Sequence, residues 1–192
     1  MIAIIDYGAG NIRSVKYALD RIGASSVLTG DPDVISNAAK VIFPGVGEAR
    51  SAMTTLKKNG LTRLIPKLQQ PVLGICLGMQ LLCEFSEEGN TPGMGIFQVE
   101  VKRFRTDLKV PHIGWNTIFD LQTALFEKIP ENTYAYFVHS YYVPENEHTI
   151  ASTEYGLRFS SALRKKNFFA TQFHPEKSGD AGEQILKNFL NL

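Results

Sequence analysis

The first half of the chain alternates short apolar runs with segments in which apolar residues recur at helical spacing. The runs lie at residues 2–5, 27–29, 40–43 and 72–75, and their length and composition predict buried strands. Helices are predicted between them, at residues 12–22, 49–56 and 61–68. Strands that alternate with helices form βαβ units, so we expect a parallel sheet whose ligands bind at the carboxyl ends of its strands.

The pattern changes after Gly89, where strand-like segments follow one another with short turns between them. These segments are residues 97–104, 110–119, 133–143, 150–154, 159–163 and 168–172. A last helix is expected at 181–190, with Ile185, Leu186 and Phe189 on one face. The whole pattern predicts an α/β fold of the flavodoxin-like or Rossmann-like kind. In this three-layer sandwich, the central, mostly parallel sheet carries an antiparallel or mixed extension in the C-terminal half.

Composition narrows the class of protein. A length of 192 residues predicts a single domain, and a net charge of +1 gives no broad electrostatic case for binding nucleic acid or membrane. The two cysteines do not form a disulfide framework and fit a reducing cytoplasm. The N-terminus lacks the basic region of a signal peptide, and no apolar stretch approaches the ~18 residues that span a bilayer.

The strand at 72–75 leads into Gly74-Ile75-Cys76-Leu77-Gly78, and a helix is expected at 79–83. A glycine two residues on either side of a cysteine is the sequence form of a nucleophile elbow, a sharp strand-to-helix turn with the nucleophile at its tip. The N–H groups at the start of the helix would favour the thiolate. The alternative is a buried structural cysteine on a glycine-rich turn.

A second chemical signal, Gln172-Phe173-His174-Pro175-Glu176, follows the last predicted strand. Pro175 favours an extended conformation at His174, and residues two apart in an extended segment point the same way. His174 and Glu176 can therefore converge, with the carboxylate orienting the imidazole. By itself His174 could be a surface loop residue, but with Cys76 it completes the parts of a nucleophilic triad.

Other candidate residues favour structural interpretations. Gly8 and Gly10 follow the first strand, but the third glycine and the acidic residue of a dinucleotide site are missing. We expect His139 to have a structural hydrogen-bonding role rather than a catalytic one, His148 to lie in a surface turn and Cys83 to lie in the core. No cluster has metal-ligand spacing, so neither a metal nor another cofactor is expected.

Gly-Ile-Cys-Leu-Gly-Met-Gln at 74–80 and His-Pro-Glu at 174–176 together resemble the class I, or triad, glutamine amidotransferases, over essentially the whole chain. Within that family the chain is most similar to the glutaminase subunits of imidazole glycerol phosphate synthases, from histidine biosynthesis. The segments that point there are Asp-Tyr-Gly-Ala-Gly-Asn at 6–11, Pro-Gly-Val-Gly at 44–47, Pro-His-Ile-Gly-Trp-Asn at 111–116 and Phe-Val-His-Ser-Tyr at 137–141.

The resemblance implies hydrolysis of glutamine to glutamate and ammonia. Cys76 would be the nucleophile, His174 the general base and acid, and Glu176 the group that holds the imidazole. The expected oxyanion donors are the backbone N–H groups of Leu77 and of one residue among Gly45, Val46 and Gly47. The residues expected to hold glutamine are Gln80, Glu88, Ser140 and Tyr141. Glu88 could instead be a solvated loop acid.

The resemblance also implies a partner, a (β/α)₈ cyclase subunit that forms a heterodimer with this chain. The cyclase would receive the ammonia through a channel and make imidazole glycerol phosphate and AICAR from PRFAR. Segment 111–116, which includes His112, is assigned to partner contact because it holds the only tryptophan, a residue enriched at interface hot spots. The expected interface residues are Asn11, Trp115, Tyr136 and Lys177; a core tryptophan at a strand end is the alternative for Trp115.

Two other functions stay open on the sequence. The same chemistry could serve another synthase, such as anthranilate or aminodeoxychorismate synthase, although segments 44–47 and 111–116 favour the first assignment. A flavodoxin-like binding module with an incidental cysteine is a different class, and it predicts that a glutamine-like electrophile does not label Cys76.

Overall fold

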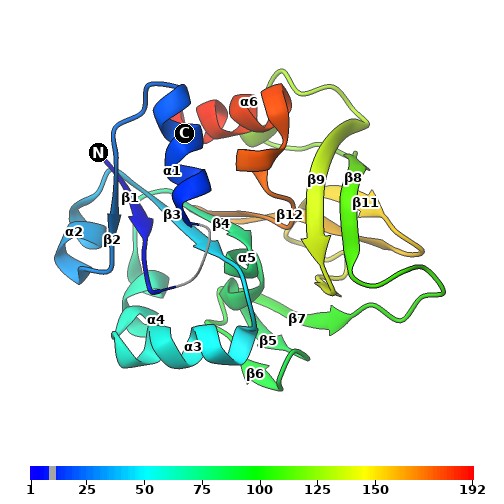
Figure 1. Ribbon diagram of the computed structural model, residues 1–192, viewed down its shortest axis with the longest axis horizontal. Coiled ribbons are helices and arrows are strands. Elements are labelled where there is room, and N and C mark those ends of the chain that lie inside the picture. The colour runs from blue at the N-terminus through cyan, green and yellow to red at the C-terminus, as the bar shows by residue number, and fades with distance from the viewer. Residues whose placement is uncertain (9–11) are drawn as a thin grey trace.

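The computed structural model describes residues 1–8 and 12–192. At its centre is a seven-stranded sheet with the strand order β11-β12-β13-β4-β3-β1-β2 (Figure 1). Its parallel part consists of β13 (Phe168–Thr171), β4 (Val72–Cys76), β3 (Lys40–Gly45), β1 (Ile2–Ile5) and β2 (Ser26–Thr29). Beyond β13, β12 (Arg158–Lys165) and β11 (Thr149–Glu154) extend the sheet antiparallel. The predicted mostly parallel sheet with an antiparallel extension is confirmed.

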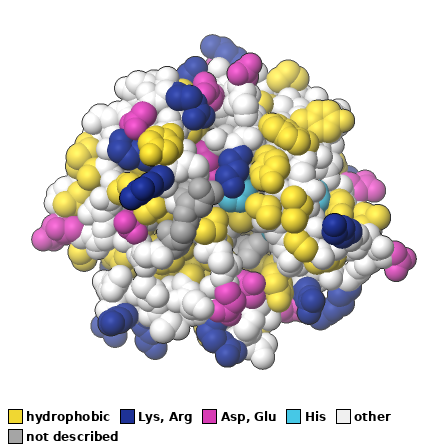
Figure 2. Space-filling view, viewed as in Figure 1, with side chains coloured by type: hydrophobic (Ala, Val, Ile, Leu, Met, Phe, Trp, Pro, Cys, Tyr) yellow, Lys and Arg dark blue, Asp and Glu magenta, His cyan; other side chains and the backbone are white. Residues whose placement is uncertain are grey.

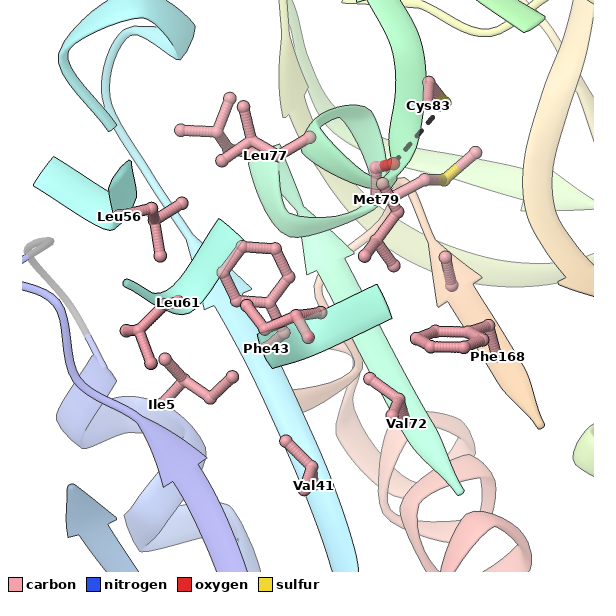
Figure 3. Close-up of a cluster of buried hydrophobic side chains, with 14 of the residues drawn as sticks. Ile5, Val41, Phe43, Leu56, Leu61, Val72, Leu77, Met79, Cys83 and Phe168 are labelled. Atoms are coloured by element: carbon pink, nitrogen blue, oxygen red, sulfur yellow. Dashed lines mark hydrogen bonds between the residues drawn. The ribbon is translucent and has the colours of Figure 1, made fainter. Parts of the chain in front are cut away.

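The central strands are apolar on both faces because helices cover both. Along β1, Ala3 and Ile5 belong to one core cluster while Ile2 and Ile4 belong to the other, as alternation along a strand requires. The first cluster is covered by α2 (Pro32–Asn37), α3 (Ala49–Lys58), α4 (Leu61–Leu64), the 3₁₀ turn η1 (Ile65–Lys67) and α5 (Leu77–Leu82) (Figure 3). The second is covered by α1 (Ile12–Arg21), the 3₁₀ turn η2 (Ala124–Phe126) and α6 (Gly179–Leu190).

Two smaller sheets lie beside the central one. The hairpin of β8 (His112–Ile118) and β9 (Thr133–His139) is antiparallel throughout. A mixed four-stranded sheet has the order β10-β7-β5-β6. Its strands are β10 (Tyr141–Tyr142), β7 (Phe97–Arg103), β5 (Cys83–Ser86) and β6 (Thr91–Pro92).

Several predicted boundaries are wrong, each for a local reason. Helix α5 ends at Leu82, and Cys83 begins β5, because the N–H groups of residues 94–96 take the carbonyls of residues 81–83. The predicted strand 133–143 is two strands that break at Ser140. The predicted helix 61–68 becomes 3₁₀ after Leu64, since Pro66 has no N–H to donate. Helix α2 and strands β5 and β6 were not predicted.

The last helix matches its prediction more closely. Helix α6 begins two residues earlier than expected, and Ile185, Leu186 and Phe189 are all buried against the sheet. None of the helices in residues 1–8 and 12–192 is long and apolar enough to cross a membrane.

Candidate active site

The turn from β4 into α5 holds Cys76 in a strained conformation. Cys76 has φ 54° and ψ −111°, a region that side chains rarely adopt. The turn is tight enough that a Cβ on Gly78 would lie 1.9 Å from the Phe43 carbonyl oxygen, and one on Gly74 would lie 2.8 Å from Leu82 Cδ1. Glycine at both positions is therefore a steric requirement of the turn, and the turn sets the thiol at the end of a parallel strand.

His174 reaches the same place from the end of β13. Its backbone is extended, and Pro175 then begins the 3₁₀ turn η3 (Pro175–Lys177). Its Nδ1–H donates to Glu176 Oε1 at 2.8 Å, and both side chains are almost fully buried. Two hydrogen bonds hold the main chain of His174: its N–H donates to the Tyr136 carbonyl of β9 at 2.9 Å, and the hydroxyl of Ser178, just after η3, donates to the His174 carbonyl at 2.7 Å.

The charges around His174 favour its protonated form. Burial by itself would lower the pKa of His174, but the neighbouring Cys76 and the Glu176 carboxylate outweigh burial and raise that pKa above its ordinary range. Because Nδ1 is committed to Glu176, the ring meets a proton donor or acceptor through Nε2, which has no hydrogen-bond partner among the described residues. This ring is therefore set to exchange a proton on its Nε2 side.

Cys76 and His174 open into one cleft of about 370 Å³, a size suited to a small molecule. Glu176, which is hydrogen-bonded to His174, and Gly45 do not line this cleft. The other lining residues include nearly all those expected from the sequence to act with Cys76 and His174, namely Val46, Gly47, Leu77, Gln80, Glu88, Ser140 and Tyr141.

The segment after β3 borders the cysteine. Gly45 pairs in register with Cys76, and a Cβ on Gly45 would lie 2.9 Å from Gly78 N, Leu77 Cβ and Tyr7 Oη. Gly47 has φ +98°, which favours glycine. Leu77 is the first residue of α5, so its N–H has no acceptor within the helix.

Comparison with known proteins identifies the family of this chain. A model of the glutamine amidotransferase class-I family matches residues 3–192. The chain belongs to the class I glutamine amidotransferases. The chain is 59% identical to "Imidazole glycerol phosphate synthase subunit HisH" of Bacteroides fragilis (strain YCH46), with 100% of this chain and 99% of that one covered. The protein of the same name from Haemophilus influenzae (strain 86-028NP) is 49% identical, with 98% and 96% covered.

Solved structures agree on the fold. A structure described as glutamine amidotransferase superposes with a TM-score of 0.78 at 18% identity, covering 100% of this chain and 98% of the other. A chain of PurLQS from Thermotoga maritima gives 0.76 at 16% identity, covering 99% and 97%. The resemblance and fold class expected from the sequence are confirmed, and membership of this enzyme family speaks against a binding module with an incidental cysteine.

One residue of this amidotransferase site received no role from the sequence. Gln172 is fully buried, and its Nε2 points at Cys76 Sγ, 3.7 Å away. Its Oε1 accepts from Gln80 Nε2 at 2.9 Å, and Gln80 Nε2 also donates to the Tyr141 carbonyl at 3.0 Å. Both N–H groups of Gln80 are thus used within the protein, which leaves Oε1 for a ligand. Gln172 lies two residues before His174, and this spacing is the sequence signal that could have indicated a place for Gln172 in the site.

Glu88 is held at the cleft rather than in a solvated loop. Its Oε2 accepts from Ala49 N–H at 2.9 Å, at the start of α3, and the side chain is half-buried. Burial raises the pKa of Glu88 and the nearby Glu48 charge adds to this, while the Ala49 hydrogen bond opposes both.

The β8–β9 hairpin of the amidotransferase carries an apolar surface. Trp115 is 54% exposed, so the core alternative for it is wrong. Its ring lies across from that of Tyr136, over which Lys177 Nζ sits at 5.8 Å. Ile113 and Tyr134, 57% and 61% exposed, enlarge the patch; Figure 2 shows hydrophobic side chains gathered on this side of the molecule. Asn11 lies outside the described residues.

Two histidines differ from their expected surroundings. His112, assigned to partner contact, is buried, because the inward side of β8 packs it against His139 and aromatic rings. His148 lies in a turn as expected, but its ring packs on Phe97 and its side chain is only 13% exposed. Cys83 is fully buried in the core, as predicted.

Proposed function

We propose that this chain is the glutaminase subunit of an imidazole glycerol phosphate synthase, built as a single domain over residues 1–192 and working in the cytoplasm without a cofactor. The observation that carries the proposal is the meeting of Cys76 with the Glu176-bound His174 in one cleft of a chain whose full-length relatives bear that name. The names of those relatives favour this synthase over anthranilate or aminodeoxychorismate synthase.

In the proposed reaction, His174 Nε2 takes the proton of the Cys76 thiol, and the sulfur attacks the side-chain amide carbon of glutamine. The C–N bond breaks as His174 returns the proton to the leaving nitrogen, which departs as ammonia. Water, deprotonated by the same imidazole, then hydrolyses the thioester to glutamate. Glu176 holds the ring by Nδ1 and favours the imidazolium that forms twice in the cycle.

The negative oxygen of each tetrahedral intermediate needs preorganised donors. Leu77 N–H is one candidate, and an N–H from Gly45, Val46 or Gly47 is the other. The steric crowding at Gly45 and the positive φ of Gly47 support this segment as one that requires glycine to approach the site. In this proposal Glu88 would hold the amino group of glutamine, and Ser140, Tyr141 and Gln80 Oε1 would hold the rest of its head group; all four residues line the cleft.

Ammonia made in the cleft has to reach an acceptor before water protonates it. We therefore propose that a (β/α)₈ cyclase subunit docks on the exposed patch of Trp115, Tyr136 and Lys177, together with Asn11, and receives ammonia through a channel. We expect the 45–47 peptide to turn an N–H into the oxyanion site only when the loaded partner is docked. The free subunit should then be nearly inactive, because one missing oxyanion donor costs a factor of about 10²–10³.

The test is a glutaminase assay on the purified chain alone, with the cyclase, and with the cyclase and its substrate or a stable analogue. Activity should rise at each step. Trp115→Ala should weaken association with the cyclase, whereas Tyr17→Ala, which removes another exposed aromatic ring, should not. Full activity in the isolated chain, unchanged by the partner and its ligand, would contradict the partner assignment. Activation by another synthase subunit instead would redirect it.

A further inference from the structure

The proposed mechanism leaves a buried histidine pair unexplained. His112 and His139 face each other at one end of the β8–β9 hairpin, 3% and 6% exposed, among the rings of Phe104, Phe137 and Phe159. Polar nitrogens among aromatic rings are unfavourable unless they are hydrogen-bonded. His139 lines the cleft that holds Cys76, so the pair connects the hairpin with the candidate active site.

The carbonyl of Tyr141 fixes the proton on His139. His139 Nδ1 lies 2.8 Å from that oxygen, which can only accept, so Nδ1 carries the proton. In the neutral ring Nε2 is then an acceptor. It lies 3.0 Å from His112 Nδ1, which must therefore be the donor.

Asn116 fixes the other end of the chain. Its Oδ1 accepts from Thr117 N–H at 2.8 Å, so the amide nitrogen is the atom that faces the Glu154 carbonyl at 2.9 Å and His112 Nε2 at 3.3 Å. His112 Nε2 accepts from that nitrogen. Protonating either imidazole would set two N–H groups against each other unless Asn116 flipped and lost both of its backbone partners.

Burial agrees with neutral rings. It lowers the pKa of His112 to about 4 and that of His139 to about 3, and for His139 this outweighs the Tyr141 hydrogen bond, which acts in the opposite direction. The charges of His112 and His174 lower the pKa of His139 further, and no carboxylate contributes to its shift.

The chain continues from the Tyr141 carbonyl to the sulfur. This oxygen accepts from both His139 Nδ1 and Gln80 Nε2. The second N–H of Gln80 goes to Gln172 Oε1, so Gln172 is oriented with its own N–H toward Cys76 Sγ. The Tyr141 oxygen accepts from both sides, so Gln80 takes its direction from this carbonyl, and Gln172 takes its direction from Gln80.

We infer that Asn116, His112 and His139 are positioning residues of the glutaminase site. They form a hydrogen-bond chain through two neutral Nδ1–H imidazoles that ends on the Tyr141 carbonyl. This chain holds the carbonyl oxygen where Gln80 donates to it, so that Gln80 in turn directs an N–H of Gln172 toward the Cys76 sulfur. The inference rests on the proposed function of Cys76. A donor at that sulfur stabilises the thiolate, and an inverted Gln172 would present a carbonyl oxygen and repel it.

The first test does not depend on enzymatic activity. In the chain labelled with ¹⁵N at histidine, the ring nitrogens of His112 and His139 should both show the neutral Nδ1–H tautomer at pH 7. An Nε2–H tautomer, or a charged ring, at either residue would overturn the inference. Because this readout needs no glutamine, it remains decisive even if the proposed function fails.

The second test is kinetic, in the complex with the cyclase. His112→Phe keeps an aromatic ring and removes both nitrogens; it should lower glutamine-dependent kcat about tenfold, the equivalent of one hydrogen bond to a charged group, with ammonia-dependent synthesis unchanged. His148→Phe removes a mostly buried imidazole outside the chain and should leave both rates unchanged. Equal loss of the glutamine-dependent and ammonia-dependent rates in His112→Phe would mean a purely structural role.

A double variant shows whether the pair acts through Gln172. Gln172→Ala should cost about as much as His112→Phe, and the two together should cost little more than one, because both break the same chain. Multiplied losses in the double variant would show that His112 does not act through Gln172. Alkylation of Cys76 by iodoacetamide should slow by the same factor in each variant, a readout that depends on the sulfur alone.

Discussion

His174 and the pair of His112 and His139 are buried histidines at one cleft, which His174 and His139 line, but their electrostatic surroundings are opposite. His174 contacts the Glu176 carboxylate and lies beside Cys76, and these neighbours raise its pKa although burial opposes them. His112 and His139 meet each other, an amide and a backbone carbonyl, and burial lowers the pKa of both. All three rings are buried to a similar extent, but the group that accepts from Nδ1–H differs. It is a carboxylate for His174, a ring nitrogen for His112 and a backbone carbonyl for His139.

The comparison shows what turns a buried imidazole into a proton carrier. A carboxylate compensates the charge of the imidazolium, so the ring can take up the proton of the thiol at Nε2 although it is buried. A carbonyl or amide compensates only a dipole, so the ring stays neutral and serves as a directional hydrogen-bonding group. Histidine therefore serves two different functions around one cleft.

Removing the nucleophile should have the largest effect. Cys76→Ala should abolish glutamine-dependent turnover, while synthesis from added ammonia by the complex stays intact, because free ammonia bypasses the only step that Cys76 performs. Loss of the thiol should also lower the pKa of His174, and NMR of the histidine ring can follow this change. Retained glutaminase activity would remove Cys76 from the mechanism.

Changes to the other two triad residues, His174 and Glu176, should have the next largest effects. His174→Ala should be nearly as damaging as Cys76→Ala, since the two act as a unit. Glu176→Gln should be milder, a loss of about 10²-fold in glutamine-dependent kcat, because the amide oxygen still accepts from Nδ1 but no longer compensates the imidazolium. Unchanged kcat in Glu176→Gln would mean that orientation alone is sufficient.

The histidine pair should make stability fall on the acid side. Between pH ~6.5 and pH ~4 the unfolded chain binds protons that the folded rings do not, so each ring lowers stability by up to about 1.4 kcal/mol per pH unit as pH falls. His139→Phe should flatten that slope in urea titrations at stepped pH.

His174 should act with the opposite sign. Because its folded-state pKa is raised, its contribution is fully present below pH ~6.5 and is lost as pH rises through the folded pKa. His174→Ala should therefore flatten the alkaline side of the stability curve.

The pair of His112 and His139 has its own contradicting outcome. An acid slope unchanged by His139→Phe would mean that the pair is not neutral in the folded chain.

The smallest effect is expected at the second cysteine. Cys83 Sγ lies 3.5 Å from the Met79 carbonyl, and burial, followed by Glu84, raises the pKa of this thiol, so it should stay protonated and unreactive. Cys83→Ser should keep full glutaminase activity at a cost of about 1 kcal/mol in the free energy of unfolding. Activity lost in Cys83→Ser but with folding intact would contradict this division between the two cysteines.

Sequence patterns were sufficient to predict β1, β2, β3 and β4 of the parallel sheet, the last helix and the turn at Cys76, but not the parallel pairing of β13 with β4. Each has a signal in residues near one another in the chain: alternation decides which face a side chain takes, and the glycines on either side of Cys76 indicate the sharp turn. The contact that requires Gly78, by contrast, comes from the Phe43 carbonyl on the neighbouring strand β3. The two-residue spacing of His174 and Glu176 is equally local, and their contact was predicted.

The contacts of His112 and Gln172, and the strand conformation at Cys83, depend on the tertiary structure. His112 meets His139 because β8 and β9 pair in one register, and a shift of β8 by one residue would turn His112 to the other side of the hairpin, away from His139. Cys83 leaves its expected helix because residues 94–96 supply its neighbours with hydrogen bonds. Gln172 meets Gln80 across 92 residues of chain. A pattern of apolar and polar positions records which side of an element is buried, but the partner that each buried polar group finds is fixed only when strands distant in sequence come to lie side by side.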